Sequence, residues 1–327
     1  MDYDEENNST VTEYSIDPKP ILFSILLFVE IASILCSLII LIYFFFHWKS
    51  MINKALQNHV IFLLIIVSLL YTTLDLPFTL NSQRIGYDYP QTVSFCRWWY
   101  WIDWTLLVNS LYLTAIASIQ RHILIFHNHL LQINRIRLKL YYIPLIFSII
   151  YPATFYLITI YFYPCEMPTY DYVQYCPYPC YCDNLILYTI DYMINTVFPV
   201  VIIIIIANII LVCRVIHSMK KIRRNHFDIW KRQKKLTLQL LSISLLYIIG
   251  WGPVTVVSVI QMFFMPNIYD DIPDIYYVTF SIYFICTMQS FISLFALPEL
   301  LSFIKKKLKQ ILSKETVTPV QTILPTR

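Results

Sequence analysis

Seven long apolar segments dominate this sequence and restrict its fold more than any other feature. We place them near residues 21–47, 56–80, 97–126, 140–163, 186–213, 236–264 and 275–303. Each is long enough to cross the roughly 30 Å hydrocarbon core of a bilayer as a helix. Because lipid offers no hydrogen bonds to the backbone, only helices or closed barrels can span it. The sequence therefore predicts an all-α bundle of seven transmembrane helices.

The composition supports a membrane protein and argues against an enzyme. Hydrophobic residues make up 58% of the chain and charged residues 13%, which is too apolar for an ordinary soluble domain. With three glycines in total, the chain has no glycine-rich loop for a nucleotide, and its histidines form no His-Glu-x-x-His motif. We therefore predict no enzymatic activity, no metal site and no cofactor. Confinement to the membrane also excludes a nucleic-acid partner.

Basic residues are concentrated in alternate loops, which indicates the orientation of the chain. With these seven segments, 21 of the 24 lysines and arginines lie on one side of the membrane and nearly all acids on the other. The positive side is expected to be cytoplasmic. We therefore predict a multi-pass cell-membrane protein with an extracellular segment over residues 1–20, a seven-helix membrane domain over 21–304 and a cytoplasmic segment over 305–327.

Both flanking segments have features that fit these sides of the membrane. Asn7 and Asn8 begin overlapping sequons, which favour glycosylation of an extracellular segment. Ser302–Leu312 mixes lysines with apolar residues, which is typical of an amphipathic helix lying on the inner membrane surface. Basic runs within residues 214–235 favour contact with anionic lipid of the inner leaflet and with a cytoplasmic partner.

Cysteines gather on the predicted outer side, where an oxidising environment lets disulfides persist. The five outer cysteines are Cys96, Cys165, Cys176, Cys180 and Cys182. All five cannot pair among themselves, so one is free or pairs with Cys286 in the seventh segment, and the sequence leaves the pairing open. The spacing of Cys180 and Cys182 does not match a zinc knuckle.

The third segment carries the most specific motif. Arg121 follows Cys96 by 25 residues, which is roughly 37 Å along a helix, so one helix places them at opposite membrane surfaces. This spacing, together with the run Leu-Thr-Ala-Ile-Ala-Ser-Ile-Gln-Arg-His, resembles the third helix of rhodopsin-like G-protein-coupled receptors. Gln120, Arg121 and His122 stand where most members have Asp-Arg-Tyr.

Other segments match the same family unevenly over roughly residues 21–312. Gly-Trp-Gly-Pro at residues 250–253 resembles the family's Cys-Trp-x-Pro motif, in which the proline kinks the sixth helix. Leu-Pro-Glu-Leu-Leu at residues 297–301 stands where Asn-Pro-x-x-Tyr is expected, and only the proline is retained. Ser68 takes the usual place of a sodium-binding aspartate. The chain thus resembles a divergent member.

The resemblance implies a receptor that couples an extracellular ligand to a cytoplasmic heterotrimeric G protein. It implies a disulfide from Cys96 to one of Cys176, Cys180 and Cys182, which tethers the outer loop over a ligand cavity. It also implies activation by an outward swing of the sixth helix. The residues assigned to this switch are Gln120, Arg121, His122, Trp251, Pro253 and Pro298.

Arg121 has two interpretations. In the family, the arginine is held inward at rest and then released towards a G-protein helix. Gln120 offers it a hydrogen bond but no ion pair, which would weaken the resting contacts by roughly 1 kcal/mol or more and raise basal signalling. Alternatively, Arg121 is an interfacial arginine whose side chain reaches lipid phosphate.

Three acids, Asp75, Asp103 and Asp191, lie in the outer halves of the segments. A carboxylate at membrane depth is costly and usually marks a partner or a site. Asp103 is placed where amine receptors hold a ligand ammonium, so the resemblance implies a cationic amine or a basic peptide as ligand. The alternative is an internal pair of Asp103 with Arg97 or Arg84, or simply a water-filled vestibule. The full set of predicted ligand-binding residues is Asp75, Asp103, Asp191, Asn195, Trp104, Trp251 and Phe291.

Two other functions stay open for such a sequence. One is a decoy receptor that binds a ligand without signalling. The other is a seven-helix transporter or channel, although the chain shows no internal repeat of the kind common in transporters. A retinal protein is excluded because residues 275–303 contain no lysine.

Overall fold

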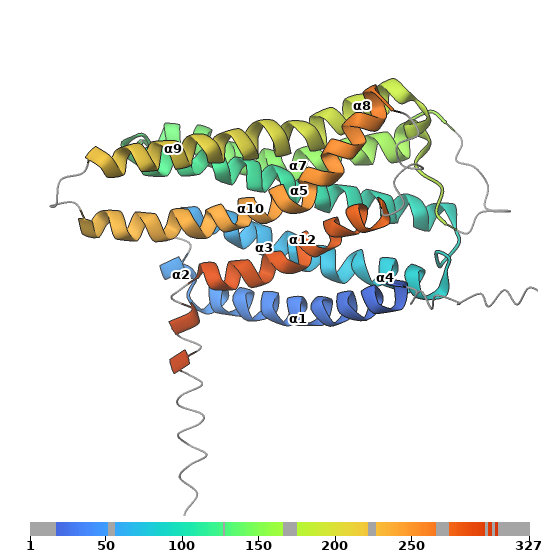
Figure 1. Cartoon of the computed structure of the whole chain (residues 1–327), viewed down its shortest axis with the longest axis horizontal. Helices are drawn as coiled ribbons and strands as arrows, with labels where there is room; N and C mark the ends of the chain where they lie inside the picture. The colour runs from blue at the N-terminus through green and yellow to red at the C-terminus, as the bar shows by residue number, and fades with distance from the viewer. Residues whose placement is uncertain are drawn as a thin grey trace, which may run out of the picture.

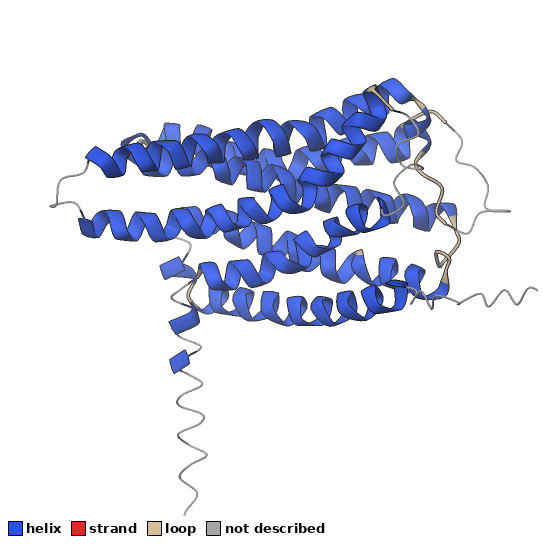
Figure 2. Ribbon diagram, viewed as in Figure 1, coloured by secondary structure: helices blue, strands red, loops and turns tan. Residues whose placement is uncertain are grey.

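The computed structural model describes residues 18–51, 56–126, 128–165, 175–221, 227–265, 275–297, 300–302 and 305–306. Within these residues the chain is helical and contains no strand (Figure 2). The helices run side by side as one elongated bundle (Figure 1). The predicted all-α class is therefore confirmed.

Among the residues that the structure describes, six helical stretches are long and apolar enough to cross a membrane, and a seventh apolar stretch is shorter. The first span is α1 (Pro18–Phe46), and the second is α3 (Gln57–Leu74) with α4 (Leu76–Ile85). The third span is α5 (Val93–Phe126). The fourth span consists of α6 (Asn134–Arg137), η2 (Leu138–Tyr142), α7 (Ile143–Leu157) and η3 (Ile158–Phe162). The fifth span consists of α8 (Leu185–Tyr192), η5 (Met193–Ile205) and α9 (Ile206–Lys221). The sixth span is α10 (Phe227–Phe263), and the seventh is α12 (Ile275–Ala296). Short helices between spans are α2 (Trp48–Met51), η1 (Asn128–Gln132) and η4 (Cys180–Asp183).

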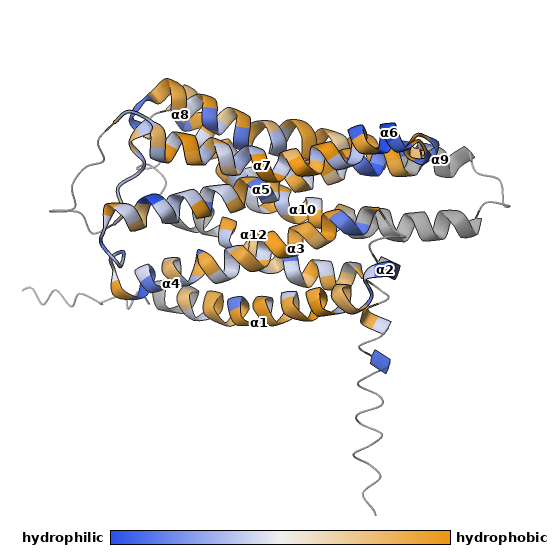
Figure 3. Cartoon of the chain, turned by 180° about the vertical axis from the view of Figure 1, so that it is seen from behind, coloured by the Kyte–Doolittle hydropathy of each residue, from blue (hydrophilic) through white to orange (hydrophobic). Residues whose placement is uncertain are grey.

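The third span lies at the centre of the bundle. It contacts spans two, four, five and six through α3, α7, η5 and α10. Of its apolar window 72% is buried, against 28% for the fourth span. Hydrophobic residues predominate along the spans, and hydrophilic residues are frequent near the helix ends, as at α2 and α6 (Figure 3). We call the end of the bundle that holds Cys96 the disulfide end, and the opposite end the Arg121 end.

Asp75 lies at a break in the second span. Pro77 has no backbone N–H, so it cannot donate to the carbonyl of Thr73 four residues earlier. As a result α3 ends at Leu74 and α4 begins at Leu76, with Asp75 between them. Its side chain is 1% exposed. The kink thus places a carboxylate inside the bundle.

Proline also shapes the fifth span, where η5 is a π-helix that contains Pro199. In a π-helix each N–H pairs with the carbonyl five residues earlier, and Pro199 has no N–H to pair with Ile194. The Ile194 carbonyl instead accepts a hydrogen bond from the Tyr112 hydroxyl at 3.2 Å. This bond joins the third span to the fifth.

The sixth and seventh spans approach closely at Gly250. A Cβ atom added there would lie 2.3 Å from Cγ1 of Ile285 in α12, whereas one added at Gly252 would meet nothing within 4 Å. The Ser281 hydroxyl in α12 donates to the Gly250 carbonyl at 2.9 Å. Glycine at position 250 therefore allows α10 and α12 to pack together just before Trp251.

A cluster of hydroxyl groups joins the first, second and seventh spans. Ser68 donates to the Cys286 carbonyl at 2.6 Å and lies 3.1 Å from the Ser290 hydroxyl. Ser37 and Ser33 hydrogen-bond to the same Ser290 hydroxyl at 2.6 and 3.3 Å. Ser68 therefore belongs to a neutral network at the position where the resemblance would place an aspartate.

Several predicted boundaries differ from those observed. The sixth helix begins at Phe227, nine residues before the predicted start at 236, because the helix continues beyond its apolar part. The predicted features at Asn7, Asn8, Pro298 and most of Ser302–Leu312 lie outside the described residues, as do the ends of the chain, so the predicted division into 1–20, 21–304 and 305–327 stays a prediction.

Candidate functional site: a cavity at the disulfide end and a buried arginine at the other

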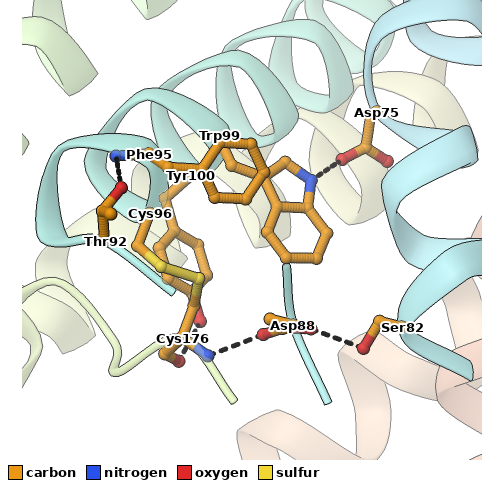
Figure 4. Close-up of a disulfide and its surroundings, with 9 residues drawn as sticks. All are labelled: Asp75, Ser82, Asp88, Thr92, Phe95, Cys96, Trp99, Tyr100 and Cys176. Atoms are coloured by element: carbon orange, nitrogen blue, oxygen red, sulfur yellow. Dashed lines mark hydrogen bonds between the residues drawn. A yellow bond between two sulfur atoms is a disulfide. The ribbon is translucent and has the colours of Figure 1, made fainter. Parts of the chain in front are cut away.

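Two disulfides organise the loop at the disulfide end. Cys96, at the first turns of α5, is bonded to Cys176, and Cys165 is bonded to Cys180. Of the three partners that the sequence left open for Cys96, the structure therefore selects Cys176 (Figure 4). Cys182 is the free cysteine of this loop, and it does not pair with Cys286, which is also free.

Further hydrogen bonds fix the loop around Cys176. The Cys176 N–H donates to Asp88 Oδ2 at 2.6 Å, and the Ser82 hydroxyl donates to Asp88 Oδ1. The Tyr100 hydroxyl donates to the Cys176 carbonyl at 2.9 Å (Figure 4). Cys176 is thus held from α4, from α5 and from the connection between them.

A cavity of about 380 Å³ lies between the spans beneath this loop. Spans two to seven all contribute to its walls. The described residues that line it include two acids, Asp103 and Asp191, and no lysine, arginine or histidine. Most of the remaining wall is aromatic, and its rings come from Tyr71, Trp104, Tyr156, Tyr178, Tyr188, Tyr192, Trp251 and Tyr283.

Asp103 projects from α5 into the cavity wall. Its Oδ1 atom is buried and accepts no hydrogen bond from any residue that the structure describes. Neither Arg97 nor Arg84 therefore donates to this oxygen, as the alternative prediction of an internal pair would require. A buried carboxylate oxygen without a donor is costly, so a donor from a ligand would stabilise it.

Asp191 on α8 lines the same cavity but is held by three donors. The Tyr156 hydroxyl donates to Oδ1 at 3.2 Å, and the Tyr181 hydroxyl donates to Oδ2 at 2.7 Å. Asn195, one turn further along, donates its Nδ2 to Oδ1 at 2.6 Å. These bonds replace part of the water that the carboxylate loses on burial and fix its orientation.

Three predicted ligand-binding residues do not line the cavity in its described part. Asp75 accepts a hydrogen bond from Nε1 of Trp99 at 2.6 Å, and its other oxygen is buried without a described donor (Figure 4). Asn195 is 1% exposed, and its side chain donates a hydrogen bond to Asp191. Phe291 packs against the hydrophobic core. The predicted set therefore divides into Asp103, Asp191, Trp104 and Trp251 at the cavity, and these three beside or below it.

Sequence reasoning missed the tyrosines of the cavity and one further acid. Tyr71, Tyr156, Tyr188 and Tyr283 come from four different spans, and no local pattern distinguishes them among 26 tyrosines. Glu30 lies within the first apolar segment and is 5% exposed in the bundle. The rule that an acid at membrane depth faces the interior would have found Glu30.

Arg121 lies inside the bundle near the opposite end. Its side chain is 2% exposed, which contradicts the interpretation of an arginine that reaches lipid. Nη1 donates to Asn208 Oδ1 in α9 at 3.2 Å and to the Ser244 hydroxyl in α10 at 3.1 Å. Nε and Nη2 are buried and have no acceptor among the described residues. Arg121 thus connects spans three, five and six through neutral partners.

The neighbours of Arg121 face other spans. Gln120 donates its Nε2 to the Tyr141 carbonyl in the fourth span at 3.1 Å. Nε2 of His122 lies 2.7 Å from the Ala207 carbonyl in the fifth span. The sequence assigned Gln120 as the hydrogen-bond partner of Arg121, whereas the structure gives that place to Asn208 and Ser244.

These features define a multi-pass membrane receptor, with a tethered loop over a cavity at one end and a buried arginine at the other. The family described as 7 transmembrane receptor (rhodopsin family) matches residues 37–292, more than three quarters of the chain. The chain therefore belongs to the rhodopsin family of G-protein-coupled receptors, whose members are signalling receptors rather than enzymes. A search of curated proteins found no match.

Proposed function

We propose that this receptor binds a positively charged ligand in the cavity at the disulfide end and passes the signal to a heterotrimeric G protein at the Arg121 end. On this proposal the disulfide end is extracellular and the Arg121 end is cytoplasmic. The observation that carries the ligand class is Asp103, which lines a cavity without a described basic residue and has a buried oxygen without a described donor.

The physical chemistry of the cavity favours a cation over a neutral or anionic ligand. A buried carboxylate requires a counter-charge or donors, and an ammonium group supplies both at once. Trp104, Tyr156 and Trp251 also line the cavity, and an aromatic ring attracts a cation placed over its face. An anionic ligand would meet two acids and is disfavoured by repulsion.

The size of the cavity limits what enters it. At about 380 Å³ it lies at the small end of the range for ligand pockets. It holds a small amine completely, or one side chain or the terminus of a basic peptide whose remainder stays outside. Both ligand classes predicted from the sequence therefore remain within the proposal, and both depend on the same carboxylate.

Signalling would follow from a shift between two arrangements of the spans. A ligand that contacts α5, α8, α10 and α12 together changes the relative stability of their arrangements, provided that it binds one of them more tightly. Pro253 in α10 supplies a hinge between the cavity and the part of α10 that holds Arg121 through Ser244. Release of Arg121 from Asn208 and Ser244 would then open the cytoplasmic side for the G protein.

Ligand binding by the purified receptor in nanodiscs tests the proposal. The panel pairs each primary amine with the alcohol of the same shape, and binding is read as the rise in melting temperature with concentration. We expect amines alone to bind, and Asp103→Asn to weaken them about 10- to 100-fold, the range expected for loss of a charge-assisted hydrogen bond worth about 1.5–3 kcal/mol.

Glu30→Gln is the matched control for that experiment. It removes another buried acid that does not line the described cavity, so amine binding should change little. Equal binding of amines and alcohols, or an Asp103→Asn variant that binds amines as the wild type does, would contradict the proposal.

A further inference from the structure

The cavity contains two carboxylates rather than one. Asp103 comes from α5 in the third span and Asp191 from α8 in the fifth, so the two acids reach one cavity from different spans. No described residue of the lining is basic. A ligand with a single positive charge would satisfy one carboxylate and leave the other without a counter-charge.

The two carboxylates differ in what they need. Asp191 has fixed donors in Tyr156, Tyr181 and Asn195, all of which are neutral. Neutral donors orient a carboxylate but do not cancel its charge, and an uncompensated buried charge is costly. Asp103 Oδ1 has no described donor at all. Both acids can therefore gain from a cation, by different amounts.

The walls beside Asp191 are suited to a second cation. The ring of Trp104 lies 5.6 Å from that of Tyr156 and 5.9 Å from that of Tyr181. These two tyrosines are the residues whose hydroxyls hold Asp191. A cation at Asp191 would thus have a carboxylate on one side and aromatic rings beside it, which is a favourable arrangement for an ammonium group.

The cavity wall also has apolar parts. Leu107 and Val108 in α5 and Val254 in α10 belong to the same lining as Asp103 and Asp191. An aliphatic chain packs well against such side chains, because its burial removes apolar surface from water. The lining therefore offers both carboxylates for charged groups and apolar surface for an aliphatic chain.

From these observations we propose that the cavity recognises a dication, of the α,ω-diamine class, with one ammonium group held by Asp103 and the other by Asp191. This inference rests on the proposed function and narrows its ligand class. It distinguishes Asp191 from Asp75, which is also buried but absent from the described lining. The role of Asp191 is thus to select for a second charge.

A chain-length series of linear diamines, from propanediamine to octanediamine, tests the inference on the full receptor in nanodiscs. Each diamine is compared with the monoamine of the same chain length. We expect the best diamine to bind at least tenfold more tightly than its monoamine. Asp191→Asn should abolish this difference by weakening the diamine alone, whereas Asp103→Asn should weaken both and Glu30→Gln neither.

Asp191→Glu provides a second test that keeps the charge at this position. Glutamate is longer by one methylene group, so the preference for a diamine should persist and the optimum should move to a shorter chain. This shift cannot arise from a general loss of folding. A melting temperature without ligand, measured for each variant, identifies any that do not fold.

The outcomes separate the two proposals. If diamines and monoamines bind equally, or if Asp191→Asn weakens both alike, the dication inference is wrong while the proposal of a cationic ligand stands. If Asp103→Asn affects neither class of ligand, the proposed function itself is wrong, and the inference that rests on it is wrong as well.

Discussion

At the scale of single residues, the environment of Arg121 is the least expected feature. Its acceptors, Asn208 and Ser244, are both neutral, and Gln120 bonds to the fourth span instead. The sequence predicted weak resting contacts for Arg121 from the glutamine at position 120. In the structure the contacts of Arg121 are neutral, as predicted, but they are made with Asn208 and Ser244 rather than with Gln120. The level of basal signalling stays a prediction.

The first prediction concerns Asn208. Asn208→Asp would turn its 3.2 Å contact with Arg121 into an ion pair, with loss of the hydrogen bonds that Nδ2 of Asn208 donates to the Ile204 carbonyl and the Ser118 hydroxyl. A buried charge-assisted hydrogen bond is stronger than a neutral one by roughly 1 kcal/mol, so ligand-free nucleotide exchange on the G protein should fall about fivefold. Gln120→Asp places the same charge on a side chain that faces Tyr141 and serves as the comparison. If the two substitutions lower basal exchange equally, the contact with Asn208 is not the one that holds Arg121.

The second prediction concerns the free thiol of Cys182 in η4. Burial, and next the charge of Asp191, raise the pKa of Cys182 from the usual 9.0 to about 12. The reactive thiolate is therefore scarce at pH 8, and alkylation should be about a thousandfold slower than for an unperturbed thiol. The rate should increase with pH up to about 12. Peptide mapping after iodoacetamide treatment measures the rate at this site.

Cys213 and the unfolded protein provide the controls for that measurement. Cys213 is exposed in the structure, and denaturation removes the burial of Cys182. Fast modification of Cys182 in the folded receptor at pH 8 would show that its thiol is neither buried nor beside Asp191.

At the scale of helices, the close approach of α10 and α12 makes a direct prediction. In Gly250→Ala the new methyl group would meet Ile285 at 2.3 Å, so the two helices or the isoleucine must move. Overpacking of this kind typically costs about 1–3 kcal/mol. We expect a melting temperature several degrees lower in nanodiscs. The double variant Gly250→Ala/Ile285→Ala should lose less than the sum of the two single variants, because alanine at position 285 lacks both Cγ1 and Cδ1.

Gly252→Ala is the matched control for the glycine prediction. It has the same chemistry two residues away, where an added Cβ meets nothing within 4 Å. Its melting temperature should stay the same or rise, because alanine favours a helix over glycine. Equal losses in the two variants would mean that the effect at position 250 does not come from Ile285.

Some helical features follow from the sequence, and others depend on contacts that no local pattern contains. Pro77, Pro199 and Pro253 indicate distortions of the second, fifth and sixth spans, because each lacks a backbone donor. By contrast, the donors around Asp191 come from α7 and η4, and they meet only when the bundle is folded. The sequence predicted Asp191 as a site residue without the network that orients it.

At the scale of the whole molecule, the alternation of apolar segments and charged loops was enough to predict the bundle. The spacing from Cys96 to Arg121 was specific enough to predict the family. The partner of Cys96 could not be predicted, because Cys176, Cys180 and Cys182 lie within seven residues and their distance along the chain does not distinguish them. The folded loop brings Cys176 to Cys96. For the same reason the cavity wall, which is assembled from six spans, was predicted only in part.

The central claim is that the cavity at Asp103 and the arginine at position 121 belong to one signalling receptor. Nucleotide exchange on a panel of purified G proteins tests it most directly. The wild-type receptor, Arg121→Ala and Asp103→Asn are compared in nanodiscs, each with and without the linear diamines. We predict that the wild type accelerates exchange, that Arg121→Ala abolishes this effect, and that Asp103→Asn removes only its dependence on the diamine. Diamine binding without exchange on any G protein, in the wild type as in Arg121→Ala, would contradict the account and indicate a decoy receptor.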